Sequence, residues 1–543
     1  MTKQEGRWSP IRWITLAVLV LAASLGWSSA SVAQTKKGVL RVGINAAELP
    51  TLTGQPTQGG TGFRWTGWTV FDSLVYWDIN QDDHIPVEKP YLAEEYYPKP
   101  DDKSKWVFKL RRGVKFHDGS DFNADAVIWN LEKLFKKDAP QYDVKQISAT
   151  SCCMMDVKGW TKIDDYTVEI DTGTPNAMLP YRLPWFRIAS PTQWKKLGSW
   201  DAFEKHPSGT GPFKVAEVTP GQRAVLVRND AYWNKERLPK VERMELLPIA
   251  DHNTRTAALL SGQVDFIESP PPDMLPRLQS SGMQIVRNRY PHIWPYILRV
   301  AGDATPFKDV RVRKAINLAV DRDGMVKLLG GNALPAKGLM LPESSWFGTV
   351  DFKIRYAPDE AKKLLQEAGY GPSNPLKFTA LISPGGSGQM QPLPMNEFIQ
   401  QNLKAIGVDL TFKVVEWQTL RTMRNKGPLD PSNVEIHAVN NSWETSNPAI
   451  GMESLFASWK TAPAGVNWGV NDPELDALIK KILVTFDRTE QDELMRKAHK
   501  IVVDNAYWLF VVHDINLHAM SPRVKGFKPA ISWNLDYTQI SVE

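Results

Sequence analysis

The chain has 543 residues, more than one hydrophobic core accommodates, so its length predicts two or three lobes. Hydrophobic residues make up 42% and charged residues 23% of the chain, which excludes disordered and fibrous proteins. The 65 Lys and Arg against 60 Asp and Glu leave a net charge of only +5, so no global basic field for nucleic acid is expected.

The two cysteines, Cys152 and Cys153, are too few for a disulfide scaffold or for a four-ligand zinc finger. They are adjacent and lack Cys-x-x-Cys spacing, which favours two ordinary residues over a vicinal disulfide or a soft-metal site. The 21 tryptophans outnumber both the 14 tyrosines and the 20 phenylalanines. Such flat, amphipathic rings suit ligand stacking, although most of them are expected to serve the core or the surface.

The N-terminal segment has the pattern of a secretory signal peptide. Basic residues among the first twelve precede an apolar run over 13–26, and Ser31-Val32-Ala33 places small residues at the cleavage positions. We therefore expect residues 1–33 to be removed. The apolar run is shorter than the ~20 residues that span a bilayer. No cysteine lies near the cleavage site, so we predict an exported, soluble protein that is not a lipoprotein.

Strand and helix patterns alternate along the rest of the chain. Apolar alternation predicts strands over 38–43, 106–110 and 166–170, and Asn123 is placed to cap a helix between the last two. Interleaved strands and helices indicate α/β or α+β layers.

Helices are clearer in the second half. We predict one helix over 310–326, one that begins at Pro358 and ends at Gly369, one after Asp472, and one opened by a capping box, Thr489-x-x-Asp492. Gly- and Pro-rich breaks predict loops, either facing a cleft or on the surface, at 54–62, 270–272 and 384–394.

Motifs for catalysis are absent. The chain has no Gly-x-Ser-x-Gly elbow, no Walker A loop, no Gly-x-Gly-x-x-Gly fingerprint and no His-Glu-x-x-His. Asp78-x-Asn80-x-Asp82 begins like a calcium loop, but Asp83 stands where Gly is needed and Lys89 where a bidentate Glu is needed. We therefore predict no metal and no cofactor.

The segment Trp106-Val-Phe-Lys-Leu-Arg-Arg-Gly-Val-Lys-Phe-His-Asp-Gly119, continued by Phe122-Asn-Ala-Asp-Ala-Val-Ile-Trp-Asn130, resembles the signature of the family 5 extracellular solute-binding proteins of ABC importers. The physical interpretation of Arg111–Gly113 and His117–Gly119 is two tight turns, not a ligand site. Further blocks follow in the family's order, at Gly209–Phe213, Thr256–Asp265, Pro306–Ala315 with Ala319–Arg322, Tyr356–Tyr370 and Val524–Phe527.

The resemblance implies a fold and a division of the chain. The fold is α/β with a mixed α+β subdomain, of the periplasmic-binding-protein type II, in which two hinged lobes close on a ligand. The implied division is a signal peptide over 1–33, a first-lobe core over 34–65, 207–290 and 515–543, an extra subdomain over 66–206, and a second lobe over 291–514.

The resemblance also places the ligand site. Peptide-binding members use a Trp-x-x-Asp segment to bind the free α-amino group of the ligand, and the corresponding stretch here, Asn440–Pro448, has no Asp. Either Glu444 replaces that carboxylate, or the solute is a sugar, opine, conjugate or metal chelate without a peptide-like ammonium. Asn440, Asn441 and Trp443 are the first expected contacts, with strand-end hydrogen bonding and core packing as the alternative.

Further candidates follow from their expected positions at the lobe junction. They are the loop residues Trp65 and Trp68, Trp294 on the expected hinge strand, and Trp417 with Arg421, where Arg could clamp a carboxylate.

The predicted function is the periplasmic substrate-binding component of an ABC-type importer. It captures a small solute, either a peptide, a peptide-like compound or another small polar molecule, and delivers it to permease subunits in the inner membrane. We expect a monomer with no enzymatic activity and no nucleic-acid partner. A secreted hydrolase with scattered catalytic residues and a chaperone-like binder of unfolded segments are the alternatives.

Overall fold

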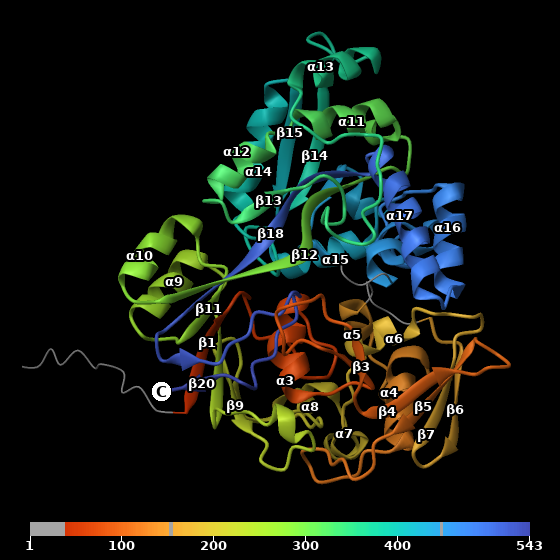
Figure 1. The fold of residues 1–543 in the computed structure, drawn as a ribbon, viewed down its shortest axis with the longest axis vertical. Helices are drawn as coiled ribbons and strands as arrows, with labels where there is room; N and C mark the ends of the chain where they lie inside the picture. The colour runs from red at the N-terminus through yellow and green to blue at the C-terminus, as the bar shows by residue number, and fades with distance from the viewer. Residues whose placement is uncertain (1–37, 151–155, 446–448) are drawn as a thin grey trace, which may run out of the picture. The chain divides into compact units, whose positions relative to one another are not determined.

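A long mixed β-sheet organises the backbone (Figure 1). The computed structural model describes residues 38–543 except 151–155 and 446–448, so the predicted signal peptide and the Cys152-Cys153 pair lie outside the described residues. Within the described residues the sheet has twelve strands. The continuous path runs β15 (Val408–Val414), β14 (Leu376–Ile382), β16 (Ala438–Asn440), β12 (Gln284–Leu298), β18 (Trp508–Met520), β11 (Phe266–Glu268), β1 (Val39–Ile44), β10 (Arg243–Pro248), β9 (Arg223–Arg228) and β8 (Phe213–Thr219), while β13 (Ala333–Pro335) pairs with β18 and β17 (Trp443–Glu444) with β12.

The two long strands β12 and β18 connect the two halves of this sheet. They pair antiparallel over most of their length, with a register shift between Arg289 and Ile293. One end of β18 pairs with β11, whereas the opposite end of β12 pairs with β16. We call the elements from β1 to α10 (Leu275–Ser280), with the residues after β18, the first lobe, and the elements from α11 (Val310–Ala319) to α17 (Arg488–Asp504) the second lobe.

The predicted lobe limits at 290–291 and 514–515 fall inside β12 and β18. Because both strands run through the two halves of the sheet, the structure does not assign a single boundary residue. The predicted limits therefore stay predictions.

In the first lobe, β1 lies between two parallel neighbours, β10 and β11. Leu40, Val42 and Ile44, which lie on one face of this strand, are fully buried. The helices of this lobe are α2 (Gly60–Gly62), α3 (Trp68–Val70), α4 (Ala124–Phe135), α5 (Val144–Ala149), α6 (Leu179–Arg182), α7 (Pro191–Leu197), α8 (Trp200–Lys205), α9 (His252–Leu260) and α10, with a π-helical turn over Phe63–Gly67.

A separate four-stranded antiparallel sheet belongs to the same lobe and has its own hydrophobic core. Helix α4 packs against it and is capped as predicted, because the Asn123 side chain accepts a hydrogen bond from the Ala126 backbone N–H at 3.1 Å. The strands, in sheet order, are β4 (Ala93–Pro98), β5 (Lys105–Leu110), β7 (Thr167–Asp171) and β6 (Gly159–Asp164); two small pairs are β2 (Val75–Trp77) with β3 (Glu88–Pro90) and β19 (Val524–Lys525) with β20 (Ser541–Val542).

The turn at His117 ties this subdomain to the rest of the first lobe. The His117 ring accepts from the Gly209 N–H at 3.3 Å through Nδ1, and its Nε2 lies 2.9 Å from the Gly211 carbonyl oxygen. Burial lowers the pKa of His117 to about 4, so the ring is neutral. A Cβ on Gly209 would stand 2.2 Å from the Val70 carbonyl oxygen, so the close approach of these two backbones requires glycine.

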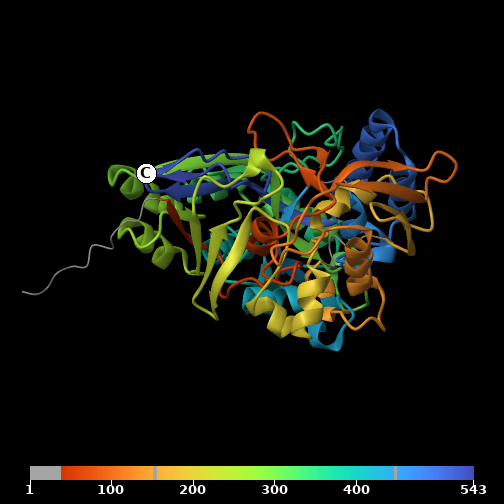
Figure 2. The same cartoon turned by 90° about the horizontal axis from the view of Figure 1, so that it is seen from below.

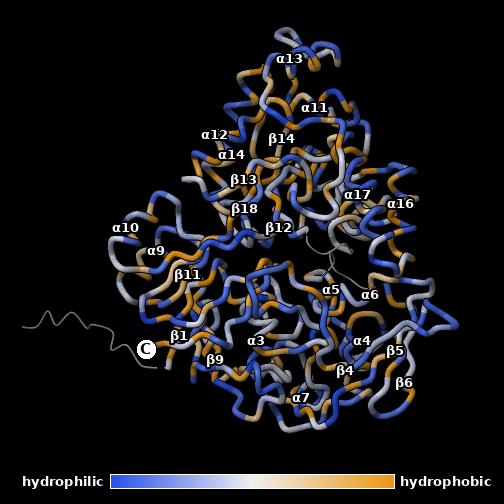
Figure 3. The backbone as a smooth tube through the Cα atoms, viewed as in Figure 1, coloured by the Kyte–Doolittle hydropathy of each residue, from blue (hydrophilic) through white to orange (hydrophobic). Residues whose placement is uncertain are grey.

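The second lobe packs its helices around β14, β15 and β16. Its hydrophobic core includes Trp294, Ile316, Phe378 and Ile399. The hydrophobic residues concentrate along the strands, whereas the tube of the outlying helix α13 is more hydrophilic (Figure 3). The helices are α11, α12 (Arg322–Leu328), α13 (Pro358–Glu367), α14 (Pro392–Lys404), α15 (Trp417–Lys426), α16 (Pro473–Val484) and α17.

Two sequence predictions for this lobe are wrong. The single helix expected over 310–326 is two helices, because Val320 is extended and Asp321 caps a new helix by accepting from the Gly324 N–H at 2.9 Å. The expected capping box at Thr489 is also absent. Asp487 caps α17 instead, and it accepts from the Glu490 N–H at 2.8 Å.

The helices α16 and α17 lie on the same side of the protein as the four-stranded sheet (Figures 1 and 2). Phe486, between these helices, stacks on Trp106 of β5 with ring centroids 6.1 Å apart. The Ala177 N–H of the first lobe also donates to the Leu483 carbonyl oxygen at 2.6 Å. The lobes therefore touch at a second place, away from β12 and β18. No helix in the described ranges combines the length and apolarity needed to cross a membrane.

Candidate binding site

A cavity of about 100 Å³ lies between the two lobes. Its walls come from segments far apart in the sequence, and aromatic rings form much of them. The first lobe and the hinge strand β12 contribute Gly59, Gly60, Phe63, Ala149, Trp185, His292 and Trp533, and the second lobe contributes Ser387, Trp417, Arg421, Arg424, Asn441, Ser442, Trp443 and Glu444.

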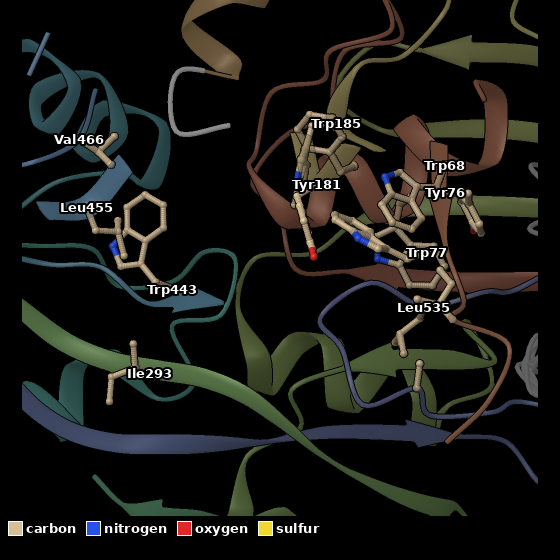
Figure 4. Packing of buried hydrophobic residues seen from close by; sticks show 14 of the residues in the cluster. Trp68, Tyr76, Trp77, Tyr181, Trp185, Ile293, Trp443, Leu455, Val466 and Leu535 are labelled. Carbon is tan, nitrogen blue, oxygen red and sulfur yellow. The ribbon is translucent and has the colours of Figure 1, made fainter. Parts of the chain in front are cut away.

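Aromatic rings face the cavity from both lobes. Trp443 begins the short strand β17, and Figure 4 shows its ring across a gap from Tyr181 and Trp185 of the first lobe. Phe63 packs edge-on against Trp185 at 4.8 Å between ring centroids. Within the described part of the chain, the buried indole N–H groups of Trp185, Trp417 and Trp443 have no hydrogen-bond acceptor. Buried donors of this kind usually bond to a water or a ligand.

Helix α15 brings three of the lining residues onto one face. The Glu416 side chain caps this helix by accepting from the backbone N–H groups of Gln418 at 2.7 Å and Thr419 at 3.1 Å. Trp417, Arg421 and Arg424 then follow at spacings of four and three residues, which place side chains on the same side of a helix.

The two arginines of this helix are buried at the lobe junction. Arg421 donates to the Ala149 carbonyl oxygen at 3.0 Å, a contact that joins the lobes. Arg424 donates to the Asn441 side-chain oxygen at 2.6 Å, and its guanidinium lies 4.9 Å from the centroid of the Trp443 ring. Arg424 thus holds both Asn441 and the Trp443 ring in place, whereas Arg421 connects the lobes.

Glu444 also joins the lobes. Its carboxylate accepts from the Ser532 hydroxyl at 3.0 Å, the Trp533 backbone N–H at 3.4 Å and the Asn534 side-chain amide at 3.5 Å. These donors belong to the C-terminal segment of the first lobe. The carboxylate therefore lies on the cavity wall with the position of its oxygens set by the opposite lobe.

His292 faces Glu444 across the pairing of β12 with β17. Its ring stacks on Trp533, with centroids 5.0 Å apart and planes at 18°. Burial, with the nearby His513 and Arg64, lowers the pKa of His292 to about 3. The cavity wall at strand β12 therefore carries the neutral imidazole of His292.

The structure brings five of the nine predicted contacts to this cavity: Asn441, Trp443, Glu444, Trp417 and Arg421. The other four lie elsewhere. Asn440 is fully buried and donates to the Pro295 carbonyl oxygen at 3.0 Å. Trp294 is in the core of the second lobe, Trp65 stacks on Tyr537 at 3.9 Å, and Trp68 stacks on Trp77 at 5.1 Å.

Sequence reasoning missed several lining residues. Arg424 follows Arg421 on the same helical face, so the helical period was a signal that could have found it. Phe63, Trp185 and Trp533 carry no comparable signal, because their places depend on how distant segments pack. His292 lies two residues from the predicted Trp294 on β12, and it is His292 that lines the cavity. In the described ranges, no group of His, Cys, Asp and Glu is arranged to hold a metal ion.

Comparisons with known proteins agree on one family. The model of the bacterial extracellular solute-binding proteins, family 5, matches residues 88–458. The glutathione-binding protein GsiB of Pectobacterium atrosepticum is 29% identical over 449 residues, which cover 80% of this chain and 82% of that protein. Heme-binding protein A of Haemophilus influenzae is 27% identical over 488 residues, 86% of each chain.

A solved structure shows the same fold. The dipeptide-binding protein from Pseudoalteromonas sp. SM9913, in complex with Met-Leu, superimposes with a TM-score of 0.81 at 22% sequence identity. The match covers 93% of this chain and 100% of that one. The two-lobed α/β architecture predicted from the sequence is therefore confirmed.

Proposed function

Because the chain belongs to the bacterial extracellular solute-binding proteins of family 5, we propose that it is the periplasmic substrate-binding component of an ABC-type importer. The family consists of binding proteins for transport rather than enzymes. The observation that carries the proposal is a cavity whose wall is shared by both lobes. A solute that touches Trp185 of one lobe and Trp443 of the other stabilises the closed arrangement, because it makes both contacts only there.

The solute that fits this wall is a peptide, a peptide-like compound or another small polar molecule. The wall carries both signs of charge, with the carboxylate of Glu444 on one element and the guanidinium of Arg421 on another. A zwitterion can pair its ammonium with the first and its carboxylate with the second. The rings of Trp417 and Trp443 offer faces for the apolar part of such a solute.

The relatives do not narrow the solute further, since their names refer to glutathione, heme and a dipeptide. This proposal therefore rests on the side chains of this chain. Asn441 and Ser442, next to Trp443, add an amide and a hydroxyl for polar groups of the ligand.

We place the protein in the periplasm as a soluble monomer. The supporting observation is the N-terminal pattern over 1–33, in which basic residues, an apolar run and small residues follow in the order of a cleaved signal peptide. Delivery of the solute requires permease subunits in the inner membrane as partners.

Thermal-shift screening with a panel of dipeptides, oligopeptides, glutathione, opines and sugars tests the function. A binding protein is stabilised by its ligand according to mass action and returns that ligand unchanged. We expect a selective rise in unfolding temperature without turnover, as read by mass spectrometry of the recovered compound. Consumption of the stabilising compound would instead indicate a hydrolase, and equal stabilisation by all extended peptides a chaperone-like binder.

A further inference from the structure

A second cavity, of about 300 Å³, adjoins the first one. The two cavities are lined by neighbouring residues of the same three segments. Gln58 lines the second cavity and Gly59 the first; Gly386 lines the second and Ser387 the first; and Trp417 lines both. The interlobe space therefore has two chambers, here named the inner chamber (the first cavity) and the outer chamber (the second cavity), and Trp417 is on the wall of both.

The position of this ring is fixed by its surroundings. Trp417 is 6% exposed and is the first residue of α15, which Glu416 caps. The ring lies against the backbone at Gly386, where φ is +126° and an added Cβ would stand 2.4 Å from the indole. The carbonyl of Gly386 accepts a hydrogen bond from the side-chain amide of Asn45 at 3.1 Å. The wall at the Trp417 ring is thus held by both lobes.

The two chambers differ in chemistry. The inner chamber has the guanidinium groups of Arg421 and Arg424 and the carboxylate of Glu444 on its wall. The outer chamber is lined chiefly by small and apolar residues, and the carboxylate of its one acidic lining residue, Glu416, accepts the hydrogen bonds that cap α15. The small and apolar residues that carry this argument are Ala46, Ala47, Ala250, Pro384, Val414 and Val415.

We propose that Trp417 is a specificity-determining residue that sets the length of the solute. The charged head of the solute occupies the inner chamber, and the indole stops the chain from continuing outward. The outer chamber is a second subsite for an uncharged, apolar extension, which it accepts when the ring is absent or turned aside. This inference rests on the proposed function, because it assumes that the inner chamber holds the solute.

The test compares the sizes of the compounds that are retained by the full mature chain and by Trp417→Ala. Both are incubated with a pool of dipeptides to hexapeptides that have uncharged side chains and either a free or an amidated C-terminus, so that the extension of the amidated peptides is uncharged. The pool is mixed with a low-molecular-mass bacterial metabolite extract, and the retained masses are read by native mass spectrometry. We expect Trp417→Ala to retain heavier compounds than the wild type and to bind the longest retained peptide at least about tenfold more tightly. Trp417→Leu and Trp417→Phe should give smaller shifts in the same direction.

Trp346→Ala is the matched control, since Trp346 is a similarly buried tryptophan (7% exposed) of the second lobe that lines neither cavity. It should retain the same masses as the wild type. If Trp417→Ala does not fold, the Leu and Phe variants decide the question. Equal mass distributions in the wild type and the Trp417 variants would overturn the inference and leave the proposed function standing. Retention of no compound by any of the proteins would contradict both.

Discussion

Buried histidines are a recurring feature at the residue scale. His292, His499, His513 and His518 are buried and His117 is partly buried, and burial lowers the pKa of each to about 3 or 4. Each of them is therefore neutral in the folded protein. In the unfolded chain the same groups take up a proton near their ordinary pKa of 6.5, so folding and proton binding are coupled.

This coupling predicts acid sensitivity. The unfolded state binds more protons below pH 6.5, so stability is full above that pH and falls as the pH decreases toward 3, by about 1.4 kcal/mol per pH unit for each such histidine. His518, which packs between Phe266 and Phe527, tests this. We expect the unfolding free energy of His518→Phe to fall less steeply below pH 6.5 than that of the wild type, with a slope smaller by about 1.4 kcal/mol per pH unit. Urea unfolding at a series of pH values measures both slopes. His206→Phe, at an exposed position, is the control, and identical slopes for the His518 variant and the wild type would contradict the argument.

Trp443 is the residue whose removal should affect binding most directly. Its ring faces the cavity and also covers Arg424. We expect Trp443→Ala to weaken binding of the solute found by screening by ~1–3 kcal/mol, as the loss of a stacking anchor does. Isothermal titration measures this change. Unchanged affinity in a variant with an unchanged unfolding temperature would rule out this role for the ring.

At the scale of the element, capping decides where helices begin. The sequence predicted α4, α13 and α16 well, because the caps of α4 and α16, the Pro358 that begins α13, and apolar periodicity are local signals. The same signals failed at 310–326, where the apolar period continues through Val320 although the backbone there is extended. Asp321 is a residue type that caps helices. Because apolar residues continue at helical spacing on both sides of it, the sequence alone does not distinguish such a cap from an aspartate inside a longer helix.

The contribution of the Asp321 cap to the unfolding free energy can therefore be measured. Asp321→Ala removes the hydrogen bond to the Gly324 N–H, and we expect a loss of about 1 kcal/mol of unfolding free energy. Asp323→Ala removes an exposed carboxylate from the same turn and should cost roughly 0.3 kcal/mol through the helix dipole. Urea unfolding of both variants distinguishes the two effects. Equal losses would mean that the cap itself contributes nothing.

At the scale of the whole molecule, the lobes meet in a charged network beside α6. Arg182 of α6 forms an ion pair with Glu453 of the second lobe, with side chains that are 1% and 2% exposed. Lys460 lies 3.5 Å from Glu453 and 2.9 Å from Asp156. The pairs Arg182–Glu453 and Lys460–Asp156 could not be predicted from the sequence, since their partners are 271 and 304 residues apart. The same reason explains why Trp65 and Trp68 were not distinguishable from Trp185 as cavity residues.

Breaking this network should favour opening of the lobes. Glu453→Gln removes one charge of a buried pair, which costs about 3–5 kcal/mol where the other charge stays buried. Opening exposes Arg182 to water and relieves that cost, so we expect weaker solute binding and a larger radius of gyration in the presence of solute, measured by titration and small-angle X-ray scattering.

The control for this experiment is Lys481→Ala, which removes an exposed ion pair with Glu490 on the neighbouring helices. Exposed pairs contribute at most about 1 kcal/mol, so this variant should bind and scatter like the wild type. A Glu453→Gln variant that also behaves like the wild type would show that the network does not hold the lobes together.

The hydrogen bonds from Ser532, Trp533 and Asn534 to Glu444 have a practical consequence. The stretch that follows the last long strand supplies the Trp533 ring to the cavity wall, so we expect it to take part in ligand binding. We expect deletion of residues 532–543 to abolish ligand binding, and it would also remove β20 and buried residues of the hydrophobic core. An environment-sensitive fluorophore attached near this stretch should change its emission when the solute binds, which would make the protein a biosensor for that solute.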